Sequence, residues 1–420
     1  MELRHRLNCG SDSAPKPATL DGYSMISNPP SAMQTAQTPD RHWQRLDGVD
    51  IFRGLAILFV VLNHVNIRLV IADIRYAVGF SPPLLASLVW NGQFGVQIFF
   101  SVSGFLITSA ALRRWGQLSN VSLRDFYLLR VARIVPMLLA LMLILIALHF
   151  AGVAPFVVTK KTGGLGRAIF AALTLHVNVL QARYGWLPAN WGVLWSLSVE
   201  EVFYLFFPLL ARFFGRGILF VLILLCFVAA GPFARTTWAH GNDVWSEQSY
   251  LGGMDAIALG CLTAMLVRTR RFSRSAQISF AALGAALILF ALLGLRIVYV
   301  PSLTRTGLDM TVIAVGTCLV MIVAAQTQWQ SPRVLKPLLQ LGQRSYEVYL
   351  THMFVIFPLF GAFILYGAPK LAVLPLFVAS TLVAALLGDL VGRYFSEPVN
   401  RALRQRWGQG PNRLGSVTNS

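Results

Sequence analysis

The stretch Ile51-Phe-Arg53-Gly-Leu-Ala-Ile-Leu-Phe-Val-Val-Leu-Asn-His64-Val-Asn-Ile-Arg-Leu-Val-Ile71 is long and apolar enough to cross a bilayer, yet Arg53 and His64 lie within it. An arginine at the bilayer centre costs about 2.5–3.5 kcal/mol, so an ionisable residue there indicates a functional site. Arg53 and His64 would lie about 16 Å apart on nearly the same helix face. The alternative is structural, with Arg53 marking the end of the span and His64 packing between helices.

The composition of the chain indicates a polytopic membrane protein. Hydrophobic residues make up 56% of the 420 positions and charged residues only 12%, with 28 Phe and 10 Trp. The formal charge of +18 is spread over short basic clusters between apolar runs, which is typical of cytoplasmic membrane loops. We therefore expect a lipid bilayer as the partner and no nucleic acid. The four cysteines have no metal-ligand or redox spacing, so no metal and no bound cofactor are expected.

Ten segments are predicted to cross the membrane. They are residues 51–71, 92–112, 134–151, 193–211, 217–234, 250–267, 276–295, 308–325, 346–366 and 373–394. An eleventh apolar segment, 168–181, is shorter, and the basic clusters fall on one side of the membrane only if it does not cross. The expected fold is an all-α bundle of about ten transmembrane helices plus one short re-entrant or interfacial helix, with both termini cytoplasmic.

The two ends of the chain differ in composition from the apolar middle. Residues 1–46 are polar and rich in Ser, Pro and Thr, which predicts a disordered cytoplasmic tail. Residues 47–400 would form the integral-membrane domain. Residues 401–420 are basic and then rich in Gly, Asn and Ser, which predicts a second flexible cytoplasmic tail.

Four more charged residues lie inside or beside the apolar segments. Glu200 and Glu201 are adjacent in a helical stretch, so their side chains point about 100° apart and one at most is expected to face a given partner. Arg130 and Arg133 share a helix face at spacing i, i+3. Two guanidinium groups spaced in this way can bind phosphates, although basic residues before a span also serve as cytoplasmic anchors.

A further polar series opens the ninth predicted span. Tyr346, Tyr349 and His352 follow i, i+3, i+6 spacing and would line one face of a helix, directed into the bundle. A lone histidine in such a position is more often a packing residue than a catalyst. The segment Ser101-Val-Ser-Gly104 offers only small residues for close helix packing.

Taken together, these segments resemble the acyltransferase 3 family of membrane O-acyltransferases. The matching blocks are Asp47 to His64 with its Arg-x10-His pattern, Gly95 to Thr108, Arg130-Val-Ala-Arg133, Trp195 to Tyr204, Ser345 to His352 and Ser396-Glu-Pro398. They occur in family order over about residues 47–400. Two departures are small: Val202 follows the glutamate pair where Gln is usual, and residues 49–52 lengthen the distance from Asp-Gly to Arg53.

The resemblance implies transfer of an acyl group, most often acetyl, from cytoplasmic acyl-CoA to a hydroxyl. The acceptor would be a carbohydrate or glycolipid such as an exopolysaccharide or lipopolysaccharide O-antigen, and the location the bacterial inner membrane. The competing interpretations are a transporter or flippase for a glycan or lipid-linked intermediate, and a non-catalytic scaffold.

Each polar residue then has an expected role in this reaction. His64 would be the base, because imidazole titrates near neutral pH, or would itself take the acyl group first. Glu200 or Glu201 would orient His64. Arg53 would bind CoA phosphates or pair with a carboxylate. The expected CoA-phosphate ligands are Arg130 and Arg133, and the remaining substrate-binding candidates are Tyr346 and His352.

Overall fold

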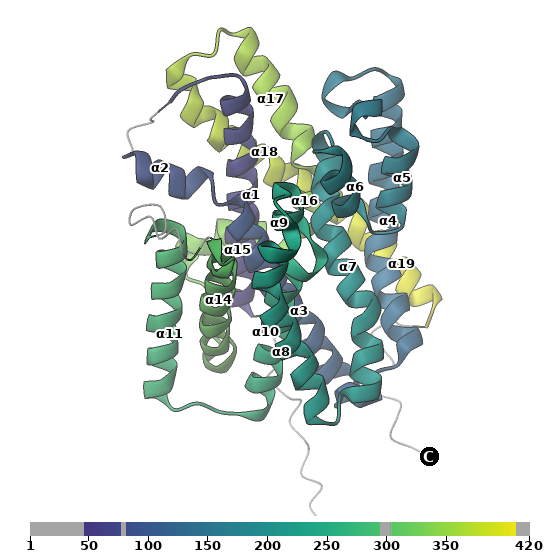
Figure 1. The fold of residues 1–420 in the computed structure, drawn as a ribbon, viewed down its shortest axis with the longest axis vertical. Coiled ribbons are helices and arrows are strands. Elements are labelled where there is room, and N and C mark those ends of the chain that lie inside the picture. The colour runs from purple at the N-terminus through teal and green to yellow at the C-terminus, as the bar shows by residue number, and fades with distance from the viewer. Residues whose placement is uncertain (1–45, 77–80, 295–302, 304, 409–420) are drawn as a thin grey trace, which may run out of the picture. The chain divides into compact units, whose positions relative to one another are not determined.

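The computed structural model describes residues 46–76, 81–294, 303 and 305–408, which are helical or irregular and include no strand (Figure 1). Nine helical runs in this part are long and apolar enough to cross a membrane. They are α1 (Asp47–Ile71), α3 (Gly92–Trp115), α4 (Leu123–Phe150), α7 (Ala189–Phe214), α8 (Ile218–Arg235), α9 with α10 (Asp243–Gln248 and Tyr250–Thr269), α11 (Arg274–Leu289), α14 (Leu308–Thr327), and α18 (Val373–Val391) continuing through a π-helical turn into α19 (Glu397–Arg406).

A tenth candidate span is broken. Helices α16 (Ser345–Thr351) and α17 (Met353–Leu365) pass the length and hydropathy test together but are bent by 49° at His352. With this pair, the ten expected spans each correspond to a helix or helix pair. The predicted all-α membrane bundle is therefore confirmed.

The short eleventh segment does not form a spanning helix. It is divided between α5 (Leu165–Leu173) and α6 (Val177–Tyr184), whose nine and eight residues cover about 14 Å or less, too little for a bilayer. The sequence predicted one short element here, and the structure has two.

Two of the helix boundaries that differ from those predicted lie next to the site residues. Helix α4 begins at Leu123, eleven residues before the expected start at 134, with Ser122 as an N-cap that accepts a hydrogen bond from the Asp125 amide. Helix α19 extends to Arg406, so residues 401–406 are helical where a flexible tail was expected. The predicted tail residues 1–45 and 409–420 lie outside the described residues.

Small residues bring the central helices α3 and α10 into close contact. A Cβ at Gly104 would lie 1.9 Å from the Ile257 carbonyl oxygen, and one at Gly260 would lie 2.0 Å from the Ser101 carbonyl oxygen. Either substitution would force the backbones apart. The packing role expected for the Ser101–Gly104 segment is thus confirmed for Gly104.

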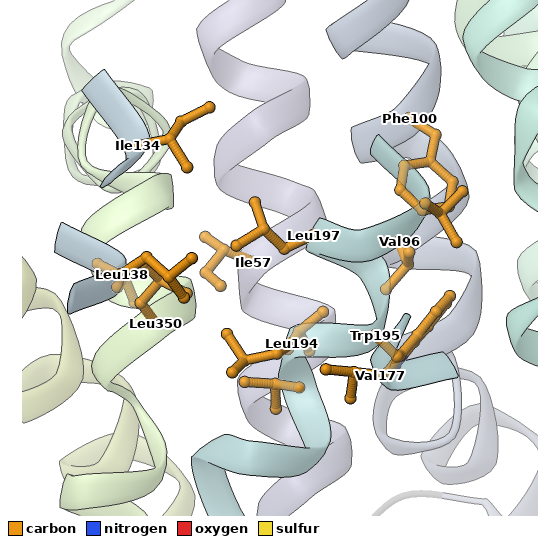
Figure 2. Packing of buried hydrophobic residues seen from close by; sticks show 14 of the residues in the cluster. Ile57, Val96, Phe100, Ile134, Leu138, Val177, Leu194, Trp195, Leu197 and Leu350 are labelled. Atoms are coloured by element: carbon orange, nitrogen blue, oxygen red, sulfur yellow. The ribbon is translucent and has the colours of Figure 1, made fainter. Parts of the chain in front are cut away.

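The apolar core surrounds the polar residues of interest. Figure 2 shows side chains from several helices converging there; the labelled ones include Ile57, Val96, Phe100, Ile134, Leu194, Leu197 and Leu350. These residues come from α1, α3, α4, α7 and α16. The same helices carry the residues singled out by the sequence.

A buried ion pair joins α8, α10 and α14. Arg235 donates to Asp255 Oδ2 at 2.8 Å and to the Thr311 hydroxyl at 2.7 Å, and also to the carbonyl oxygens of Gly307 and Gly252. Each guanidinium nitrogen has at least one acceptor. Such a fully bonded pair is a structural element of the bundle.

A second polar network attaches α19 to the start of α16. Arg344 donates to Asp389 Oδ1 at 3.0 Å and to Glu397, and the Ser396 hydroxyl donates to Glu347 Oε1 at 2.7 Å. The Ser396-Glu-Pro segment therefore holds α19 in the bundle.

Candidate active site

A cavity of about 530 Å³ opens between α3, α4, α7 and α19, with contributions from α1 and α16. Its charged lining consists of Arg53, Arg113, Arg114, Arg130, Arg133 and Arg404 together with Glu200 and Glu201. Six positive charges thus face two negative ones. A concave surface with this balance attracts anionic ligands.

The predicted arginine pair shares this cavity. The guanidinium carbon of Arg130 lies 3.6 Å from the centroid of the Tyr204 ring, and that of Arg133 lies 5.8 Å from the Tyr346 ring centroid. The Nε atom of Arg130 is buried and has no hydrogen-bond partner among the described residues. Arg130 therefore has hydrogen-bonding capacity that the protein leaves unused.

Arg53 pairs with a carboxylate and also lines the large cavity. Its Nη1 lies 3.2 Å from Asp50 Oδ1 on the preceding turn, and the side chain also lines the large cavity. A carboxylate partner offsets the cost of the charge within the span.

Glu200 has hydrogen-bond partners other than His64. It accepts hydrogen bonds from the Ser103 hydroxyl and, at 2.8 Å, from the Tyr204 hydroxyl, and the two hydroxyl oxygens also contact each other. Among the described residues, neither glutamate is hydrogen-bonded or ion-paired to His64. That a glutamate orients His64 therefore stays a prediction, and both carboxylates line the same large cavity.

A second, smaller cavity of about 30 Å³ adjoins the first. Four residues line both: Phe99, Leu197, Glu200 and Tyr346. The smaller cavity continues to Val60 of α1 and to Tyr349 of α16. Its volume holds about one water molecule, and the shared residues place it beside the arginine-lined cavity.

Two histidines lie next to this smaller cavity. The ring centroids of His64 and His352 are 4.9 Å apart in an edge-to-face arrangement. His64 Nδ1 is 2.8 Å from the Val60 carbonyl oxygen, and His352 Nδ1 is 2.7 Å from that of Tyr349. Val60 and Tyr349 are themselves lining residues of the small cavity.

These hydrogen bonds fix the tautomer of both imidazoles. A carbonyl oxygen only accepts, so Nδ1 must carry the proton and Nε2 keeps its lone pair. The Nε2 atom of His352 is buried and has no hydrogen-bond partner in the part of the chain that the structure describes. Each ring thus presents a nitrogen that can accept a proton, as a general base requires.

Sequence reasoning missed several residues of the site. Ser103 was assigned to packing, and Arg404 with Asn400 to a flexible tail or its border, whereas all three line the large cavity. The Oδ1 atom of Asn400 is buried and has no partner among the described residues. The spacing of Asn400 and Arg404, one helical turn apart, is the signal that would have placed both on one face. In the described part of the chain, no group of three His, Cys, Asp or Glu residues is arranged to hold a metal ion.

Comparison with known families gives a match over residues 46–390, to the acyltransferase domain. The chain belongs to this acyltransferase family. The match covers α1 to most of α18, and therefore every helix that contributes to the two cavities except α19.

Three relatives of this acyltransferase-family chain are bacterial. It is 22% identical over 376 residues to O-acetyltransferase OatA of Staphylococcus aureus, covering 85% of this chain and 57% of the relative. It is 26% identical over 327 residues to peptidoglycan O-acetyltransferase OatA of Listeria monocytogenes, covering 73% and 49%. It is 24% identical over 336 residues to putative peptidoglycan O-acetyltransferase YrhL of Bacillus subtilis, covering 75% and 49%. The chain thus spans about half the length of these relatives, and no solved structure matches it.

Proposed function

We propose that this protein is a membrane O-acetyltransferase that moves an acetyl group from acetyl-CoA to a hydroxyl of an exported or envelope glycan. The observation that carries the proposal is the arginine-lined cavity, beside which a smaller cavity reaches the two residues that hydrogen-bond to His64 and His352. The relatives are O-acetyltransferases by name, which supports acetyl as the group transferred.

The large cavity is the proposed site of the donor. Acyl-CoA is a polyanion because of its phosphates, and guanidinium groups bind phosphate oxygens through charge-assisted, often bidentate hydrogen bonds. Arg130 and Arg133 are the proposed ligands, with Arg53 at the cavity wall. The pantetheine arm is uncharged and would extend along Phe99, Leu197 and Tyr346, which line both cavities. Because the smaller cavity holds about one water molecule, it would have to widen to admit the thioester end.

His64 is the proposed general base. Its Nε2 would take the proton from the acceptor hydroxyl while the hydroxyl oxygen attacks the thioester carbonyl carbon. The tetrahedral intermediate would then release CoA as its thiolate, which recovers the proton from the imidazolium. The ester product and free CoA balance the reaction, and the Val60 carbonyl keeps the imidazole in the required tautomer throughout.

The proposed location is the bacterial inner membrane, with both termini in the cytoplasm. Acyl-CoA is a cytoplasmic metabolite, so the arginine cavity would open on that side. The acceptor glycan would reach His64 from the opposite side of the membrane.

The test is release of free thiol from acetyl-CoA in membrane vesicles, with a panel of acceptor glycans. We expect acceptor-dependent release by the wild type and a loss of about 100-fold or more in His64→Asn, in line with what general bases contribute. His240→Asn is the matched control, because His240 is exposed and far along the chain from the site. Undiminished release by His64→Asn would exclude His64 as the base, and glycan transport without thiol release would favour a transporter.

A further inference from the structure

Arg68 is a second intramembrane arginine on α1, at the other end of the helix from Arg53. Fifteen residues separate the two, or about 22 Å along the helix axis. His64 lies between them, one turn before Arg68 and on the same face. Helix α1 therefore carries one arginine on the donor side of His64 and one beyond it.

Among the described residues, no carboxylate forms an ion pair with the guanidinium of Arg68. The side chain is half-buried, and its Nε is buried without a hydrogen-bond partner among the described residues. Its guanidinium carbon lies 5.0 Å from the ring centroid of Phe357 on α17, which runs beside the end of α1 (Figure 1). The next carboxylate along the chain, Asp73, is exposed and makes no ion pair with Arg68.

The ring beside Arg68 belongs to an aromatic cluster. Phe357 packs against Phe156 at 5.7 Å between ring centroids. A partly buried cation without an anion is costly. An anion that arrives with a ligand would offset this cost.

We propose that Arg68 binds an anionic group, a carboxylate or a phosphate, carried by the acceptor glycan. Its fork of N–H donors suits either group. One turn of helix is about 5.4 Å, so an anion held at Arg68 brings hydroxyls of the same or the adjoining sugar to His64. The identification of this ligand as the acceptor glycan rests on the proposed function. Anion binding at Arg68 is independent of that function.

The test measures binding directly, with purified protein in maltoside detergent. The probes are trigalacturonate for a carboxylate, maltose 1-phosphate for a phosphate, and maltotriose as the neutral counterpart. We expect at least one acidic probe to bind the wild type more tightly than maltotriose does, and Arg68→Gln to weaken that binding at least tenfold. Arg75→Gln is the matched control, because Arg75 is exposed just beyond the same end of α1, and it should stay within twofold.

Three results would overturn the proposal. The first is equal binding of acidic and neutral probes, or no acidic binding, by the wild type. The second is an unchanged acidic affinity in Arg68→Gln. The third is displacement of the acidic probe by phosphatidylglycerol with the same dependence on Arg68, which would assign the arginine to a lipid headgroup.

Acetyl-CoA binding is measured on the same samples. We expect Arg68→Gln to bind acetyl-CoA as the wild type does, because Arg68 does not line the arginine cavity. Failure of the wild type to bind acetyl-CoA would count against the proposed donor site while leaving the result on acidic saccharides intact. The two proposals can therefore fail separately.

Discussion

Two intramembrane arginines, Arg235 and Arg130, show how different a buried charge can be in one bundle. Arg235 is 7% exposed. Each of its guanidinium nitrogens donates a hydrogen bond to an oxygen outside α8, and one of these oxygens belongs to the carboxylate of Asp255. Arg130 is half-buried, stacks on Tyr204 and leaves its buried Nε without a partner. A fully bonded arginine holds helices together, whereas one with unused donors beside a cavity is prepared for a ligand.

The largest effect is expected on stability, from Arg235→Leu. Removing one partner leaves Asp255 charged and buried, which costs about 3–5 kcal/mol. The thermal midpoint of the detergent-solubilised protein should fall sharply. The double variant Arg235→Leu/Asp255→Leu should recover part of the loss, because it removes both charges. An unchanged midpoint in the single variant would show that the ion pair is not a structural element.

Arg130→Gln is expected to have a smaller effect, and on the binding of acetyl-CoA in place of stability. The loss of a charge-assisted hydrogen bond to a phosphate, at about 1.5–3 kcal/mol, should raise the half-saturating concentration of acetyl-CoA about tenfold or more. The thermal midpoint should change little, because no carboxylate loses its only partner. A midpoint as low as that of Arg235→Leu, with unaltered donor binding, would make the two arginines equivalent and contradict the comparison.

The smallest effect is expected at the cavity wall formed by α19. Arg404 lines the cavity, and Arg401, three residues earlier, is exposed and does not. Since partly solvated charges contribute less than about 1 kcal/mol, Arg404→Gln should raise the half-saturating concentration of acetyl-CoA about threefold. Arg401→Gln should leave it unchanged. Equal effects of the two variants would indicate a general influence of net charge in place of a specific contact.

The sequence predicts the bundle well because each span has its own apolar run. It also predicts that Arg130 and Arg133 act together, since their i, i+3 spacing fixes a shared face before any neighbour is known. The same reasoning cannot assign partners across helices. The placement of Glu200 against Ser103 and Tyr204, and not against His64, depends on how α7 is rotated toward α3.

The C-terminal helix shows a second limit of the sequence. The stretch that contains Arg401 and Arg404 reads as a basic tail, because few of its residues are apolar. Its helix is held by tertiary contacts, above all those between Arg344 and Glu397 and between Glu347 and Ser396. Local composition carries no information about such long-range attachments, so a cavity wall was predicted to be a flexible end.

The bend between α16 and α17 has a consequence for any study of His352. In hydrocarbon, no solvent is present to satisfy a main-chain oxygen at a helix break, so another donor must do so. The imidazole N–H of His352 bonds to the Tyr349 oxygen at 2.7 Å and thereby acts as a local replacement for a missing amide. A methyl or aliphatic side chain at this position would leave the Tyr349 oxygen without this donor as well as remove a ring. Only a replacement that can still donate, such as glutamine, would separate the chemistry of the imidazole from the integrity of the broken helix.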